Sequence, residues 1–274
     1  MKSILKNSNG NAVSTGGKLL GSPESVNVMK TLLDGRKETR YLFYNYTGTS
    51  VDDLISYNDT ENVTNMQYMF YGCTNLQTIP QLDTSNVADM SNMFYNCLNL
   101  QTIPQLNTSN ATNMQYMFYR CQNLQTIPQL DTSKVNTNMA NMFYQCYNLQ
   151  TIPQLDTSNA TSINSMFYQC YKLQTIDLTS LDKISSAMSF GEAAYNCYSL
   201  TKFIIRTMTK IPPLNNNSFT NCYHFKGQVN STYNPSGLKD GRIYVPDDYV
   251  ESLKSATNWS TYADIIVPLS TLGE

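Results

Sequence analysis

The chain repeats one stretch of sequence, which stands in its fullest form as MFYNCLNLQTIPQLNTSN at residues 93–110. Close copies begin at Met69, Met117, Met142 and Met166. The intervals between the phenylalanines of these copies are 24, 24, 25 and 24 residues. Those residues are Phe70, Phe94, Phe118, Phe143 and Phe167. A fixed period of this length is typical of a solenoid, in which each repeat forms one turn of a stack.

Weaker copies lengthen the array in both directions. The copy at residues 42–46 has tyrosine where the others have cysteine, and the copies that end at Cys197 and Cys222 keep the cysteine while other positions change. We therefore predict about eight repeats of 24–27 residues over residues 42–226. Because the terminal copies are atypical, we expect them to lie next to caps that close the ends of the array.

The parts of one repeat predict different local structures. The Leu-x-x-Ile-Pro-x-Leu segment is the expected strand, and its proline should close the strand or lie at a corner because proline has no N–H to donate. An Asp-Thr-Ser-Asn cluster then turns the chain through side-chain bonds to nearby backbone. We interpret the Met-Phe-Tyr-x-Cys part as a single helical or 3₁₀ turn on the opposite side.

These motifs resemble the BspA-like class of leucine-rich repeats, which occurs in bacterial surface proteins and in phage proteins. The hallmark of that class is a phenylalanine, then a cysteine, then a short Leu-x-x-Ile strand, and NVTNMQYMFYGC at residues 62–73 is a typical instance. The resemblance covers about residues 42–222. It implies a leucine-rich-repeat solenoid of short parallel strands and short helical or 3₁₀ turns, and adhesion or recognition in general. It brings no set of functional residues with it.

Two flanking segments complete the predicted organisation. In residues 1–41, Ser22 and Pro23 open a helix that Gly35 stops, so we expect an attachment segment whose helix 22–34 covers the first repeat. Residues 227–274 begin with a polar loop and continue through a second helix that starts at Pro246. That tail resembles the segment that closes such repeats in phage-encoded members, and we interpret it as a C-terminal α/β cap.

Composition and the N-terminal sequence argue against nucleic-acid binding, membrane insertion and standard secretion. Charged residues make up 14% of the chain and the net charge is −2, so no basic field exists to hold nucleic acid or anionic lipid. No apolar run approaches the length that spans a membrane. Residues 1–21 lack the pattern of a signal peptide. If the sequence is complete, we therefore expect no standard secretion.

Seven cysteines occupy the same position of successive repeats, and we expect them to be buried thiols that act as small apolar filler. Zinc sites need ligand pairs two to four residues apart, which this spacing does not provide. An odd count and a shared direction argue against disulfides, although stacked repeats would lie close enough for them. The cysteines are Cys73, Cys97, Cys121, Cys146, Cys170, Cys197 and Cys222.

Few residues suggest catalysis or metal binding, and we predict neither an enzyme nor a cofactor or metal site. His224 is the single histidine, and the sequence contains no nucleophile elbow, zinc-protease motif or phosphate-binding glycine loop. Asp83, Asp131 and Asp156 form a partial row of carboxylates that Asn107 interrupts. We interpret these aspartates as turn caps rather than calcium ligands.

Two rows of repeated side chains are the candidate binding surface. If they project outward at the spacing of the repeats, they form a flat, uncharged, aromatic-rich surface suited to a glycan or a protein. The alternative is that they stack on themselves and only stabilise the solenoid. The rows are Tyr71, Tyr95, Tyr119, Tyr144 and Tyr168, and Gln81, Gln105, Gln129 and Gln154.

We therefore expect a phage virion protein, a fibre or receptor-binding component that displays this solenoid to a host-surface glycan or protein. The N-terminal segment would attach it to other virion proteins, and analogy with phage fibres suggests a homotrimer. One alternative is a bacterial cell-surface or secreted adhesin. The other is a purely structural decoration protein of the virion.

Overall fold

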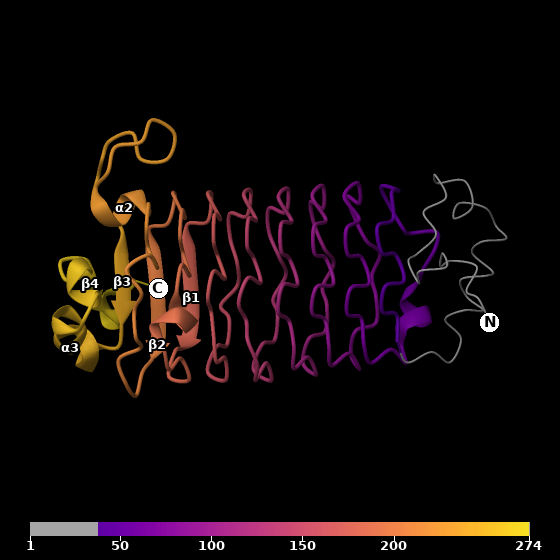
Figure 1. The fold of residues 1–274 in the computed structure, drawn as a ribbon, viewed down its shortest axis with the longest axis horizontal. Helices are drawn as coiled ribbons and strands as arrows, with labels where there is room; N and C mark the ends of the chain where they lie inside the picture. The colour runs from indigo at the N-terminus through magenta and orange to yellow at the C-terminus, as the bar shows by residue number, and fades with distance from the viewer. Residues whose placement is uncertain (1–37, 274) are drawn as a thin grey trace.

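A computed structural model describes residues 38–273 as a solenoid of stacked repeats. The turns of the chain follow one another along a single long axis, with the C-terminal elements at one end (Figure 1). One continuous apolar core runs through the stack from Leu42 to Ile266. The predicted helix at residues 22–34, and most of the proposed attachment segment 1–41, lie outside the described residues.

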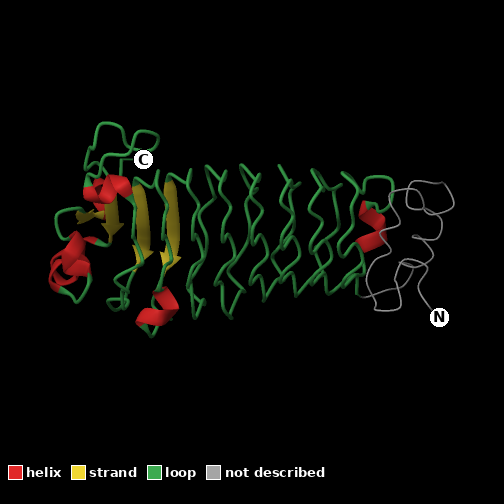
Figure 2. Ribbon diagram, turned by 45° about the horizontal axis from the view of Figure 1, so that its top comes forward, coloured by secondary structure: helices red, strands yellow, loops and turns green. Residues whose placement is uncertain are grey.

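Regular strands occur only near the C-terminal end of the described chain (Figure 2). They form one parallel sheet in the order β1-β2-β3-β4, in which Phe203 lies opposite both Ile176 and Ile243. The prediction of stacked repeats with parallel strands and short helices is thus confirmed. The strands are β1 (Thr175–Ser180), β2 (Lys202–Thr207), β3 (Arg242–Val245) and β4 (Ile266–Pro268).

The prediction of a regular strand in every repeat is wrong for the repeats that contain proline. Around Pro80, Pro104, Pro128 and Pro153 the chain forms no regular strand, and pairing is limited to isolated contacts such as the bridge between Leu155 and Leu178. Two causes combine. Proline donates no hydrogen bond, and Ile-Pro-Gln-Leu is one residue longer than the Ile-Asp-Leu of β1. The regular ladder begins where both features disappear.

The Met-Phe-Tyr-x-Cys segment is a chain of tight turns, so the prediction of a single helical or 3₁₀ turn is also wrong. Backbone N–H groups alternate in direction: Phe94 donates to Met117 of the next repeat at 2.9 Å, whereas Tyr95 donates back to Asn92 at 3.1 Å. Asn92 and Asn96 have φ of 58° and 63°. Such left-handed residues, four positions apart, direct alternate peptide groups toward the neighbouring repeat.

Phenylalanines and cysteines form the core of each turn. Successive phenylalanine rings stack almost parallel, with centroids 5.4 Å apart for Phe70 and Phe94 and 5.5 Å apart for Phe94 and Phe118. All seven cysteines are free and buried, as predicted. Their thiols also donate hydrogen bonds: Cys121 Sγ lies 3.1 Å from the carbonyl oxygen of Phe94 in the preceding repeat. The thiol therefore satisfies a buried backbone acceptor as well as filling space.

The helices are short, and most of them lie in the C-terminal part of the described chain. The helix predicted after Pro246 is confirmed, and it buries Val250 and Leu253 as expected. Trp259 packs beyond β2, where its Nε1 donates to the carbonyl oxygen of Pro212 at 2.8 Å. None of the helices in residues 38–273 is long and apolar enough to cross a membrane. The helices are η1 (Tyr57–Thr60), η2 (Ala187–Phe190), α2 (Tyr223–Lys226), η3 (Asp247–Tyr249), α3 (Val250–Ser255), η4 (Trp259–Tyr262) and η5 (Leu269–Thr271).

Candidate functional site

The predicted tyrosine row is a ladder of rings stacked on one another. Its centroid distances are 4.5 Å between Tyr71 and Tyr95, 4.4 Å between Tyr95 and Tyr119, and 4.6 Å between Tyr144 and Tyr168. Each of these tyrosines is half-buried. Because neighbouring rings cover both faces of an interior tyrosine, the ladder presents ring edges and hydroxyls to solvent rather than flat aromatic faces.

A second tyrosine row lies beside the first and was not identified from the sequence. Tyr147, Tyr171 and Tyr198 stack with centroids 4.8 Å and 4.7 Å apart. The pattern was present in the sequence, because each of these tyrosines directly follows a core cysteine. Burial, followed by the neighbouring tyrosines, raises the pKa of Tyr171 to about 12. The same causes raise the pKa of Tyr144 in the first row to about 12, and its neighbours include Tyr147 of the second row.

The predicted glutamine row is exposed and connects successive repeats. Gln81 Nε2 donates to the backbone carbonyl of Gln105 at 2.6 Å, and Gln105 Nε2 donates to that of Gln129 at 2.7 Å. Gln129 continues the pattern to Gln154 at 3.2 Å. These side-chain amides supply hydrogen bonds between repeats in the segments where proline replaces the strand ladder. The glutamines therefore contribute to the structure of the solenoid.

Three of these glutamines, Gln81, Gln105 and Gln129, also line an open groove of about 620 Å³. Tyr57 of η1 contributes to the groove, although sequence analysis did not select it. The ladder tyrosines are not among the lining residues, so the two predicted rows do not share this groove. The lining consists of Tyr57, Gln81, Leu82, Asp83, Thr84, Gln105, Leu106, Asn107, Thr108, Ser109, Gln129 and Asp131.

The row of aspartates caps turns, as interpreted from the sequence. Asp83 Oδ1 accepts a hydrogen bond from the N–H of Ser85 at 2.9 Å, and Asp131 Oδ1 accepts one from Ser133 at 3.0 Å. Asn107 makes the same contact in the repeat between them. Hydrogen bonds from Ser133 lower the pKa of Asp131. Within residues 38–273, no group of three or more histidine, cysteine, aspartate or glutamate side chains is placed to hold a metal ion.

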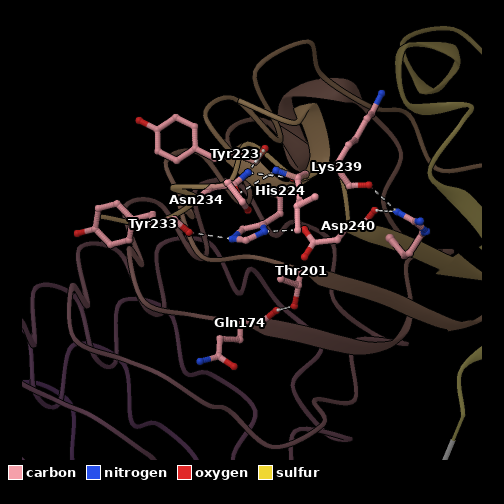
Figure 3. A network of polar contacts seen from close by, with 12 residues as sticks. Gln174, Thr201, Tyr223, His224, Tyr233, Asn234, Lys239 and Asp240 are labelled. Atoms are coloured by element: carbon pink, nitrogen blue, oxygen red, sulfur yellow. Dashed lines mark hydrogen bonds and ion pairs between the residues drawn. The ribbon is translucent and has the colours of Figure 1, made fainter. Parts of the chain in front are cut away.

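His224 fixes the loop at residues 227–241 to the solenoid (Figure 3). Its Nδ1 lies 2.6 Å from Asp240 Oδ1, and its Nε2 lies 2.9 Å from the backbone carbonyl of Tyr233. Both ring nitrogens are therefore engaged by residues of the same loop. The Tyr233 ring packs over Tyr198 of the second tyrosine row, with centroids 4.9 Å apart. The loop thus covers part of that row.

Comparison with known proteins places the repeats in a family. The model of a family described as a Mycoplasma protein of unknown function, DUF285, matches residues 37–151, 98–206 and 122–233. The chain belongs to this family. The matches overlap, as expected when one family pattern fits several registers of a repeated sequence. A comparison with curated proteins finds no match.

Proposed function

We propose that this member of the DUF285 family is a non-enzymatic adhesion or recognition protein of a phage virion, either a fibre or a receptor-binding component. Its solenoid would bind a glycan or a protein on the host surface. The observation that carries the proposal is the outer surface of the repeats, where uncharged polar side chains recur in rows and line an open groove. A stiff stack that presents the same groups at a constant spacing suits recognition of an extended ligand.

The finer architecture belongs to the same proposal. We infer a BspA-like leucine-rich-repeat solenoid of about eight repeats over residues 42–226, with an attachment segment and helical cap at residues 1–41 and an α/β cap at residues 227–274. The C-terminal cap is supported by β3 and β4, which extend the sheet beyond β2. Burial of Trp259 against Phe190, with ring centroids 6.0 Å apart, supports it further. The N-terminal segment would contact other virion proteins, and the homotrimer rests on analogy with phage fibres.

Two other functions fit the same repeats, and a fractionation experiment separates one of them, the bacterial surface adhesin, from a virion protein. Virions and cell envelopes from the native source are separated by density, and the chain is quantified in each by mass spectrometry. Enrichment in virions is the expected result. Enrichment in envelopes would replace the proposal with a bacterial surface adhesin.

A binding assay separates the receptor-binding function from a purely structural virion role. Purified, fluorescently labelled full-length chain should bind host cells in a saturable way, and unlabelled chain should compete for the sites. Assembly into virions without such binding would favour the decoration protein instead. A labelled protein of similar size and charge serves as the control for non-specific adsorption.

A further inference from the structure

The groove combines an exposed aromatic ring with repeated hydrogen-bonding groups. Among the described residues, Tyr57 is the exposed aromatic side chain, with 49% of its surface accessible. Its environment contrasts with that of the ladder tyrosines, whose ring faces are covered by their neighbours. Tyr57 therefore offers a face on which a flat apolar surface of a ligand can stack.

Local contacts hold Tyr57 at the groove. The N–H of Ser56 donates to Asp59 Oδ2 at 2.8 Å, which closes a capping box at the start of η1. At the end of η1, Thr60 Oγ1 accepts the backbone N–H of Asp83 at 2.8 Å, which fixes the helix to a residue of the groove lining. Hydrogen bonds from Ser85 and from the Tyr57 side chain lower the pKa of Asp83. The ring is thus oriented before any ligand arrives.

Along the groove, successive side chains point alternately into the core and out to solvent. Leu82 and Leu106 are buried, each at 1% exposure, so the glutamine before and the Asp or Asn after each leucine face outward. Within residues 38–273, Asp131 Oδ2 and Asn107 Nδ2 make no hydrogen bond, and the Oε1 atom of Gln105 makes none either. Most of these atoms are acceptors, so the groove suits a ligand rich in hydroxyl donors.

Charge in the groove selects among such ligands. Asp83 and Asp131 are its charged lining residues, and both are acidic. Placing a second negative charge beside them is unfavourable, because like charges repel more strongly as water is displaced. Uronates, sialylated sugars and phosphorylated polymers therefore fit this groove poorly.

We propose that the groove binds a short neutral oligosaccharide, with one sugar ring stacked on Tyr57 and hydroxyls donating to the glutamine and aspartate rows. The proposal rests on the recognition function proposed above and assigns it a site and a ligand class. The groove lining comes from four successive repeats, and Tyr57 belongs to the first of them. At ~4.8 Å per repeat, the three steps between these repeats accommodate roughly two or three sugar rings of about 5 Å each.

The test begins with the full-length chain on a printed array of neutral and acidic glycans. The best neutral trisaccharide is then titrated by calorimetry. We expect Tyr57→Ala to weaken its binding at least about tenfold, because the stacking face is removed. Tyr57→Phe keeps that face and should stay within about threefold of the wild type. Met188→Ala, which removes an exposed apolar side chain outside the groove, should leave the affinity unchanged.

Asp131→Asn provides an independent variant that preserves the fold. Asn107 already makes the equivalent turn contact in the neighbouring repeat, so the substitution should leave the melting temperature unchanged. The neutral trisaccharide should bind about three- to tenfold more weakly, because the turn contact keeps Oδ1 and the charged acceptor Oδ2 is replaced by Nδ2, which is a donor. An acidic trisaccharide should lose less affinity or gain some.

The outcomes separate the groove from the wider function. If the chain binds no neutral glycan, or if Tyr57→Ala and Asp131→Asn bind the trisaccharide like the wild type, the groove proposal is wrong. If both variants still bind host cells, the recognition function is retained and uses a surface other than the groove. Trisaccharide binding that is lost in the variants, without any host-cell binding by the wild type, would support the groove and overturn the proposed function.

Discussion

The proline-containing repeats and the C-terminal sheet stack on the same core but join their turns differently. In the sheet, backbone groups of β1, β2 and β3 pair directly in a parallel ladder. In the proline repeats, the corresponding segment keeps a backbone bond between neighbours only at its start, such as that from Gln101 N–H to the carbonyl of Gln77 at 3.0 Å. Beyond that point, glutamine amides reach the carbonyls of the next repeat instead. The difference teaches that a solenoid can keep its period while side chains replace backbone pairing on one of its sides.

Because the two regions share one core, removing a core phenylalanine should lower the free energy of unfolding equally in both. This is the largest of the effects that we predict. Phe118 stacks between two phenylalanines of the proline repeats, and Phe203 is equally buried in β2. We expect Phe118→Ala and Phe203→Ala each to lower the free energy of unfolding by about 3–5 kcal/mol. Urea denaturation followed by circular dichroism measures both. A cost below about 1 kcal/mol for Phe118→Ala alone would mean that the proline repeats are loosely packed.

The contrast in backbone pairing should appear in amide hydrogen exchange. Ile204 lies in the middle of β2, paired with Asp177 on one side and Tyr244 on the other. The N–H groups of Gln105 and Leu106 make no hydrogen bond within the described residues. We expect the latter two to exchange roughly a hundredfold faster or more, because no bond must open first. Equal protection, measured by exchange and NMR, would reveal a strand ladder in the proline repeats after all.

Much of the core could be predicted from the sequence because it follows the repeat period. Phe118 and Cys121 recur at fixed positions, and a side chain that points inward in one turn of a stack points inward in the next. The same reasoning failed for the strands. One proline and one additional residue per repeat disrupt pairing between neighbours, and the motif itself does not reveal how two neighbouring copies align.

The candidate site was less accessible to sequence reasoning because one of its residues departs from the repeat. Tyr57 of η1 stands 24 residues before Gln81, at the position that later copies fill with glutamine, so the repeated pattern does not reveal it. The tyrosine and glutamine rows were both identified, but which of them lines a groove depends on how each segment turns. The second tyrosine row carried a regular signal in the residue after cysteine, and that signal could have been used.

The stacked tyrosines, which run from the proline repeats to the C-terminal sheet, should make the stability of the fold depend on alkaline pH. Burial, and then neighbouring tyrosines, raise the pKa of Tyr144 and Tyr171 to about 12 from an ordinary value of 10. The folded state therefore holds these protons more tightly than the unfolded state. Their contribution to stability is fully present below pH 10 and is lost progressively as the pH rises toward 12. Melting temperature against pH, with phenolate absorbance, measures the effect. In Tyr144→Phe the melting temperature should fall less steeply between pH 10 and pH 12. An unchanged slope would contradict the contribution assigned to Tyr144.

The smallest effect concerns the glutamine amides that replace the strand ladder. Gln105→Ala removes the donor to the carbonyl of Gln129, and we expect a loss of about 1 kcal/mol in the free energy of unfolding, typical of one hydrogen bond. Gln101 is the matched control: it is exposed in the same repeat, and its side chain makes no hydrogen bond within residues 38–273. Gln101→Ala should change stability by less than about 0.5 kcal/mol. Equal costs for the two substitutions would mean that the amide bridges add nothing, and that the core and the backbone hydrogen bonds between repeats hold the proline repeats together.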